Sequence, residues 1–395
     1  MRRFALCTLA LALLAGCGSS EPAATADAPA PQRTPVLTSP PPQTVEATPA
    51  SASRPAADGS PEALIREVTA LAAASPGHAA NVAPTLTPVS AESLAASDAA
   101  RQRKIAALAL EVVSKTADEP AKAQLFNNAV HYLARAQAAL ALSGDAKAEA
   151  DLMSTADDLR RRDGRSFAAA EAAGQIVELA RRKAEADGSA EAAAAYAAQA
   201  RVFAARFPHE ANRAAVTLLS AGRWCEDAGH ARPAGECYAA VADEFPESLF
   251  AAQAAGSARR VGLVGEPLRD FGGPTISGGF IKPEHLANRP VAIVFWSATD
   301  ETVPEVFAAL AEARQKNPRL AVLGVCLEDD AEMAAAAVSH LPKCPHIYSA
   351  VPEERGRRSP LARHYGVERT PLVWLVAADG RVASVDAKAE DAGRL

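Results

Sequence analysis

Cysteines are the residues of this 395-residue chain whose chemistry is easiest to define. A cysteine thiolate is a nucleophile and a redox group, and two thiols can form a disulfide where the compartment is oxidising. Six cysteines are present, and two of them, Cys7 and Cys17, lie in the amino-terminal segment. The other four, Cys225, Cys237, Cys326 and Cys344, are the candidates for thiol chemistry in the rest of the chain.

The amino terminus has the pattern of an export signal. Arg2 and Arg3 precede an apolar run, Phe4 to Leu14, which is too short to span a membrane well as a permanent helix. The run leads into Leu14-Ala15-Gly16-Cys17, which resembles a bacterial lipoprotein lipobox. This resemblance implies that residues 1–17 contain the signal and that Cys17 is lipidated as the first mature residue. The alternative is an ordinary secretory signal with a chance cysteine.

A lipobox implies a lipid-anchored protein of the cell envelope that faces the periplasm. Gly18 follows the cysteine in place of an aspartate, which by the same resemblance favours the outer membrane. Residues 18–60 are rich in Pro, Ala, Ser and Thr and contain almost no large apolar residues. Such a segment cannot bury enough apolar surface to fold, so we expect a disordered tether.

Residues 61–265 have apolar residues at helical spacing almost throughout, and Ser60 before Pro61 predicts the start of the first helix. Phe207-Pro208 recurs as Phe245-Pro246, a separation typical of helical-hairpin repeats. Residues 211–262 resemble one tetratricopeptide repeat. The resemblance is carried by small residues, an aromatic residue and a proline at the offsets that such repeats use, namely Gly222, Gly229, Ala234, Tyr238 and Pro246. A helical spacer without a ligand is the alternative for this region.

Cys225 and Cys237 lie on either side of the turn between the two helices of that hairpin. An antiparallel hairpin would bring them opposite each other, and in an oxidising compartment they could form a disulfide. Such a closed loop would stabilise the fold by ~3 kcal/mol. The alternative is two small buried side chains without a bond between them.

From residue 266 onward, strand patterns alternate with helical patterns. The run Val291–Trp296 predicts a buried strand, and a helix and a second buried strand, Arg319–Glu328, follow it. A hairpin around Asp379-Gly380 closes the domain. The chain is therefore expected to be multidomain, with an all-α region before an α/β domain of small mixed sheet and flanking helices.

Residues 267–390 resemble the thioredoxin-like domains of the TlpA/redoxin group. The features that carry the resemblance are Phe295-Trp296, Glu301 to Pro304, Gly324 to Asp329, Tyr365-Gly366-Val367 before Thr370-Pro371, and Ala378 to Arg381. The resemblance implies a thioredoxin-like fold for residues 266–395 and, in active relatives, two redox cysteines in the turn after the tryptophan.

The chain departs from that family where its chemistry takes place. Counted from Trp296, the two cysteines would fall at Asp300 and Val303. If Pro304 is instead the kinking proline of the family, the turn has lost about four residues and the cysteines with them. In both alignments no thiol stands in this turn. A redox cysteine requires a helix N-terminus that stabilises its thiolate. Here Asp300 is expected to be the N-cap, with Glu301 in the first turn. We therefore expect no catalytic residue, metal or cofactor at this position.

Thr370-Pro371 matches the cis-proline loop of the family, beside which relatives hold extended polypeptide. We expect a cis bond here, and a peptide groove formed by Trp296, Thr370 and Pro371 that binds by strand addition without turnover. The alternative is that the proline only shapes the fold.

An enzyme would have to rely on Cys326 or Cys344, as a thiol-disulfide oxidoreductase or peroxidase. The sequence places Cys326 on a buried strand and Cys344 in a loop beside His346. A metal site would need a second pair of ligands at a suitable spacing, and the sequence offers none. The net charge of −6 argues against nucleic acid as a partner. The favoured function is a non-catalytic module that binds envelope polypeptides, with the oxidoreductase and a purely structural spacer as alternatives.

Overall fold

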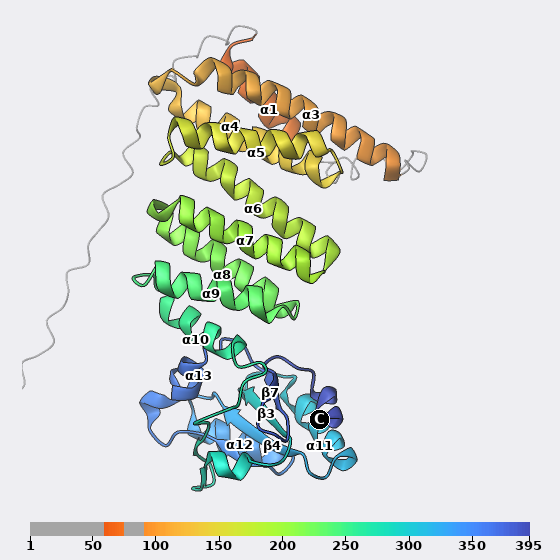
Figure 1. The fold of residues 1–395 in the computed structure, drawn as a ribbon, viewed down its shortest axis with the longest axis vertical. Coiled ribbons are helices and arrows are strands. Elements are labelled where there is room, and N and C mark those ends of the chain that lie inside the picture. Colours follow the sequence, from red (N-terminus) through yellow and green to blue (C-terminus); the bar gives the residue numbers. More distant parts are fainter. Residues whose placement is uncertain (1–58, 75–90) are drawn as a thin grey trace, which may run out of the picture. The chain divides into compact units, whose positions relative to one another are not determined.

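The computed structural model describes residues 59–74 and 91–395 (Figure 1). The predictions for the signal, for Cys17 and for nearly all of the tether lie outside these residues. Across the two described ranges, every helix is either too short or too polar to cross a membrane.

The described chain before residue 262 is helical, and each helix packs against the next one along the chain. Ser60 caps the first helix by accepting a hydrogen bond from the Ala63 N–H, as expected from the proline that follows it. Asp145, Ser166 and Ser189 cap later helices in the same way. The helices are α1 (Pro61–Ala73), α3 (Ala91–Thr116), α4 (Ala123–Leu142), α5 (Ala146–Arg162), α6 (Phe167–Asp187), α7 (Ala190–Arg206), α8 (Ala211–Asp227), α9 (Ala231–Glu244) and α10 (Ala251–Val261).

Small residues allow these helices to approach closely. Gly222 on α8 faces the ring of Tyr238 on α9, and a Cβ added at Gly222 would lie 2.7 Å from a ring carbon. The two predicted Phe-Pro stops are also present, since α7 and α9 end immediately before Phe207 and Phe245, both buried. The α8–α9 hairpin is thus packed as predicted, while its membership of the tetratricopeptide class stays a prediction.

A buried carboxylate connects three helices of this region. Glu171 on α6 lies 2.8 Å from His131 Nδ1 on α4 and accepts a hydrogen bond of 2.9 Å from Arg213 on α8. The Glu171 side chain is only 10% exposed. The hydrogen bond with His131, supported by Arg213, lowers the pKa of Glu171 to about 2. The ionised carboxylate therefore favours the packed arrangement of the three helices.

The remainder of the chain forms a five-stranded sheet in the order β5-β4-β3-β6-β7, with helices on its faces (Figure 1). Strands β3, β4 and β5 are parallel, whereas β6 runs antiparallel to β3 and β7 antiparallel to β6. This is the thioredoxin-like arrangement that the sequence predicted. The strands and helices of this part of the chain are β1 (Gly273–Pro274), β2 (Phe280–Ile281), β3 (Val291–Trp296), α11 (Val303–Lys316), β4 (Ala321–Cys326), α12 (Ala331–His340), β5 (His346–Ile347), α13 (Pro360–His364), β6 (Leu372–Val376) and β7 (Val382–Ser384). Of these strands, β1 and β2 pair with each other in a separate two-stranded sheet.

The two faces of the sheet belong to different cores. Along β3, Trp296 and Val294 pack towards α11, whereas Phe295 and Ile293 pack on the opposite face. That opposite face is continuous with the core of the helical region, which reaches it through α10. The helical region and the thioredoxin-like domain therefore share buried apolar surface and are expected to unfold together.

The segment that joins the two regions is itself paired with the sheet. Gly265 N–H donates to Val382 O at 2.8 Å, Val382 N–H to Glu266 O at 2.9 Å, and Leu268 N–H to Gly380 O at 2.9 Å. These bonds cover the β7 edge, which would otherwise present unpaired backbone groups. The linker is consequently fixed and does not act as a flexible hinge.

The Glu171 contacts generate a test of the helical core. Replacement of Glu171 by Gln removes charge-assisted hydrogen bonds, so we expect the free energy of unfolding at pH 7 to fall by about 1.5–3 kcal/mol. Because the folded pKa lies below the usual value of 4.5, this stabilisation is present above pH 4.5 and is lost as the pH falls towards 2. Urea unfolding of both proteins between pH 7 and pH 2.5 measures the difference.

Glu111→Gln is the matched control, since Glu111 forms an exposed ion pair with Lys115 on α3. We expect this control to change stability by no more than ~0.5 kcal/mol. A Glu171→Gln difference that stays constant down to pH 2.5 would contradict the assigned role of the carboxylate.

Candidate functional site

The turn after β3 holds neither a thiol nor the helix cap that was predicted. Helix α11 begins at Val303 with Thr302 as its N-cap residue, so the expectation that Asp300 caps this helix is wrong. Asp300 instead closes a local turn, accepting hydrogen bonds from the Thr302 N–H at 3.0 Å and the Thr302 hydroxyl at 2.7 Å. Val303 is 3% exposed and packs into the core. Asp300 and Val303 therefore both serve the shape of the turn.

A buried carboxylate that follows β4 holds this turn in place. Glu328, 8% exposed, accepts hydrogen bonds from the Ser297 hydroxyl at 2.8 Å and the Ala298 N–H at 3.0 Å. Its second oxygen accepts from the Asp329 N–H at 3.2 Å. The sequence placed Glu328 in an acidic turn after a buried strand, but it gave no sign of this contact with residues about thirty positions earlier.

Trp296 does not line a peptide groove, which corrects the expectation from the sequence. Its indole is completely buried, and the ring packs edge-on against Phe307 and His346. The Trp296 Nε1–H donates a hydrogen bond of 3.2 Å to His346 Nδ1. A glycine is required beside this pair, because a Cβ at Gly324 would lie 2.1 Å from His346 Nδ1.

The contact with Trp296 determines what His346 can do for Cys344. The indole N–H can only donate, so His346 Nδ1 accepts and the ring proton lies on Nε2. Nε2 is 3.4 Å from Cys344 Sγ, and it cannot take the thiol proton while it carries its own. Burial lowers the pKa of His346 to about 4, so the ring is neutral at pH 7 and provides no positive charge beside the thiol.

The remaining thiols are also poor nucleophiles. Burial raises the pKa of Cys344 to about 11 and that of Cys326 to about 12, which leaves almost no thiolate at neutral pH. Among the described residues, no cluster of three or more His, Cys, Asp or Glu side chains could hold a metal ion. At Cys344 the effect of burial on the thiol pKa outweighs the opposing effect of the Arg314 charge.

The disulfide considered between Cys225 and Cys237 is not formed, since both thiols are free. Cys225 Sγ lies 3.6 Å from Ala193 O, and Cys237 Sγ lies 4.0 Å from Ala197 O, so both point to the backbone of α7. Burial raises their pKa values to about 11 and 12. They act as the small buried side chains of the alternative interpretation.

The Thr370–Pro371 bond is cis, as expected, and both residues are half-buried. The loop that leads to this bond is held from the helical side. Arg260 on α10 donates to Tyr365 O at 2.6 Å and to Gly366 O at 2.5 Å, and Ser257 donates to Gly366 O at 3.4 Å. At Gly366 the backbone approaches α10 so closely that a Cβ would overlap it.

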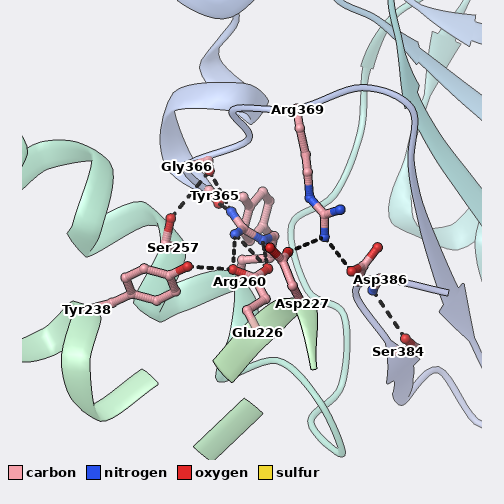
Figure 2. A network of polar contacts seen from close by, with 10 residues as sticks. All are labelled: Glu226, Asp227, Tyr238, Ser257, Arg260, Tyr365, Gly366, Arg369, Ser384 and Asp386. Carbon is pink, nitrogen blue, oxygen red and sulfur yellow. Dashed lines mark hydrogen bonds and ion pairs between the residues drawn. The ribbon is translucent and has the colours of Figure 1, made fainter. Parts of the chain in front are cut away.

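Arg260 is itself held by a buried ion pair (Figure 2). Its guanidinium donates to both oxygens of Glu226 on α8 at 2.8 Å, and each side chain is 7% exposed. The Tyr238 hydroxyl on α9 donates to Glu226 at 2.7 Å. Three helices and the cis-proline loop thus meet in one satisfied polar network, which lowers the cost of burying both charges.

A second bridge lies nearer the surface. Arg369, one residue before Thr370, forms ion pairs with Asp227 at the end of α8 and with Asp386 after β7 (Figure 2). Sequence reasoning missed both bridges. One signal in the sequence could have indicated the first bridge. Glu226 lies four residues after Gly222, so its carboxylate is one helical turn from a residue predicted to pack against the next helix.

The comparisons with known proteins that found a match are with solved structures, and those reported below cover about a third of this chain. No family model and no curated protein matches the chain. Among solved structures, the thioredoxin domain of a thiol-disulfide oxidoreductase from Bacteroides vulgatus is 13% identical and covers 33% of this chain and 93% of that one, with a TM-score of 0.30. A thiol-disulfide oxidoreductase from Bacteroides fragilis is 23% identical and covers 31% of this chain and 90% of that one, with a TM-score of 0.27. These likenesses say nothing of this chain's activity.

The buried pair between Glu226 and Arg260 can be tested by its removal. Arg260→Met keeps the apolar stem but leaves Glu226 buried without its partner, so we expect a loss of about 3–5 kcal/mol in the free energy of unfolding. The double variant Glu226→Leu, Arg260→Met removes both charges and should recover part of that loss. Urea denaturation of the three proteins measures these differences.

Arg232→Met provides the comparison, because Arg232 is 91% exposed and forms an i,i+4 ion pair with Glu236. Loss of this exposed ion pair should lower the free energy of unfolding by less than ~1 kcal/mol. Equal effects of Arg260→Met and Arg232→Met would show that the buried pair does not hold the two regions together.

Proposed function

We propose that this chain is a lipid-anchored protein of the bacterial cell envelope that binds polypeptides, with a thioredoxin-like domain that performs no redox chemistry. The observation that carries the proposal is the turn after β3. Asp300 and Val303 stand at the positions of the dithiol, and the turn is held by Glu328. The turn keeps the shape of a thioredoxin-like site and has no group that could exchange with a disulfide.

The state of the remaining thiols supports the same proposal. A thiol-disulfide oxidoreductase or peroxidase that used Cys326 or Cys344 would need an accessible thiolate. Cys326 is buried, the pKa values of both thiols are raised, and His346 has its acceptor nitrogen occupied by Trp296. These features favour binding over turnover.

Two surfaces support a binding role. The first is the cis-proline loop, where Thr370 and Pro371 remain partly accessible. The second is a groove of about 670 Å³ bounded by α4, α5, α6 and α7 and lined in part by Leu142, Met153 and Leu179. Leu142 is 47% and Met153 36% exposed, which is the kind of apolar surface that a polypeptide could cover.

The amino-terminal residues support the placement in the envelope. Cys17 ends a run that resembles a lipobox, and the Pro-rich residues after it suit a spacer between the anchor and the helical region. We place the anchor in the outer membrane, on the ground that Gly18 follows the cysteine.

A structural spacer is the second candidate function. The shared core and the paired linker favour it, because both make the helical region and the thioredoxin-like domain one mechanical unit. A spacer requires no accessible apolar groove, so the two candidates differ in whether polypeptides bind.

The proposed function predicts binding without turnover. Residues 59–395 should bind carboxymethylated lactalbumin, an unfolded chain whose blocked thiols exclude mixed disulfides, and should not accelerate insulin disulfide reduction. Thr370→Arg and the double variant Leu142→Lys, Met153→Lys each place charge on one surface, and each should weaken binding at least about fivefold if that surface is used. Fluorescence anisotropy and insulin turbidity measure the two activities.

Leu249→Lys is the control for the added charge, because Leu249 is 97% exposed and lies outside both surfaces. It should bind as the wild type does. Absence of binding by the wild type would leave the spacer as the better account, whereas insulin reduction that Cys344→Ser abolishes would establish the oxidoreductase.

The lipid anchor is tested separately in cells. Full-length protein should incorporate labelled palmitate and sediment with the outer membrane, because Cys17 is expected to be acylated. Cys17→Ala should lose the label, and Cys7→Ala should keep it. Equal labelling of the wild type and the Cys17→Ala variant would refute the anchor.

A further inference from the structure

A polar cavity of about 300 Å³ lies where α8, α9 and α10 meet the loop before the cis-proline. Several residues of Figure 2 line it, among them Glu226, Tyr238, Ser257 and Arg260, each at least nine-tenths buried. Its size falls at the lower end of the range for ligand-binding pockets, about 300–1,000 Å³. The cavity therefore has room for a small polar ligand.

The charges that line the cavity are unequal. Four arginines and three carboxylates belong to the lining, and Asp386, outside the lining, also pairs with Arg369. Each carboxylate pairs with one arginine, and these pairs are Glu226 with Arg260, Asp227 with Arg369, and Glu368 with Arg357. Arg223 on α8 is the remaining cation, and it forms no ion pair with any residue of the described ranges.

Arg223 is exposed to solvent, whereas Glu226, Tyr238, Ser257 and Arg260 form a buried part of the same lining. An anion in the cavity would therefore meet low-dielectric groups on one side and the accessible Arg223 guanidinium on the other. The buried donors are already used, because the Tyr238 hydroxyl and the Arg260 guanidinium donate to Glu226. A new anion would therefore pair with Arg223, whose fork of N–H donors fits carboxylate and phosphate oxygens.

We propose that this cavity binds an oxyanion, the carboxylate or phosphate group of a small ligand or of a polypeptide end, through Arg223. Such a ligand would contact α8 and the cis-proline loop at once. The proposal does not depend on polypeptide binding at the other two surfaces, because the cavity has its own charge and its own lining.

The test uses the full chain in detergent at low ionic strength, where exposed charges are least screened. Isothermal titration calorimetry would be carried out with inorganic phosphate, succinate, trialanine with a free carboxylate, and trialanine amide. At least one of the three oxyanions should bind with a millimolar or lower Kd, and the amide should not. Phosphate, succinate and trialanine distinguish a phosphate ligand, a small carboxylate and a polypeptide end.

Three variants establish where the oxyanion binds. Arg223→Gln should weaken binding about tenfold, the usual effect of losing a charge-assisted hydrogen bond. Asp227→Asn removes a lining carboxylate and should tighten binding, a gain that a merely structural role could not produce. Arg135→Gln changes an exposed arginine of α4 outside the lining and should have no effect.

Failure of all three oxyanions to bind at 10 mM, or equal binding by the Arg223→Gln and Arg135→Gln variants, would overturn the proposal. Neither result would bear on the proposal that the chain binds polypeptides, because that binding is measured with a different probe and different variants. Circular dichroism of Arg223→Gln confirms its fold, and Asp227→Asn tests the cavity independently if that variant is unstable.

Discussion

The buried pair of Glu226 and Arg260 is the interaction on which the arrangement of the two regions depends. One guanidinium satisfies a carboxylate of the helical region and two backbone carbonyls of the thioredoxin-like domain. A neutral side chain at position 260 could not do both, and an unpaired arginine there would incur a large desolvation cost. The loop that leads to the cis-proline therefore takes its position from α10 as well as from the sheet. The shared apolar core adds area to this contact, while the ion pair and its hydrogen bonds give it a defined geometry.

The turn after β3 takes its shape from contacts within the fold. An active turn of this kind needs its helix N-terminus to stabilise a thiolate, whereas this turn is held by hydrogen bonds to Glu328. The tryptophan before it is likewise a core residue, paired with His346 above Gly324. Each of these contacts is local to the fold and independent of any substrate. A strand, turn and helix of this shape are therefore consistent with a turn that holds no thiol.

The sequence predicted the elements well and their contacts poorly. Val291–Trp296 is a continuous apolar run, so a buried strand followed from composition alone. The Phe-Pro stops and the Ser60 cap were equally local signals. The contacts that arrange the candidate site join residues far apart in sequence. Trp296 meets His346 across 50 positions and Arg260 meets Gly366 across 106, and no spacing rule connects such residues. The prediction that Trp296 lines a peptide groove was wrong for that reason.

The paired linker has a consequence for the order in which the chain can acquire its structure. Gly265 and Glu266 find their partner only when Val382 has been made, and Arg260 meets its carbonyl acceptors only when residues 365 and 366 have been made. The helices that precede them can pack as soon as they emerge. Until then α10 would present an apolar face and an incompletely bonded arginine to whatever accompanies the growing chain. A chain cut short before β7 would leave the junction open.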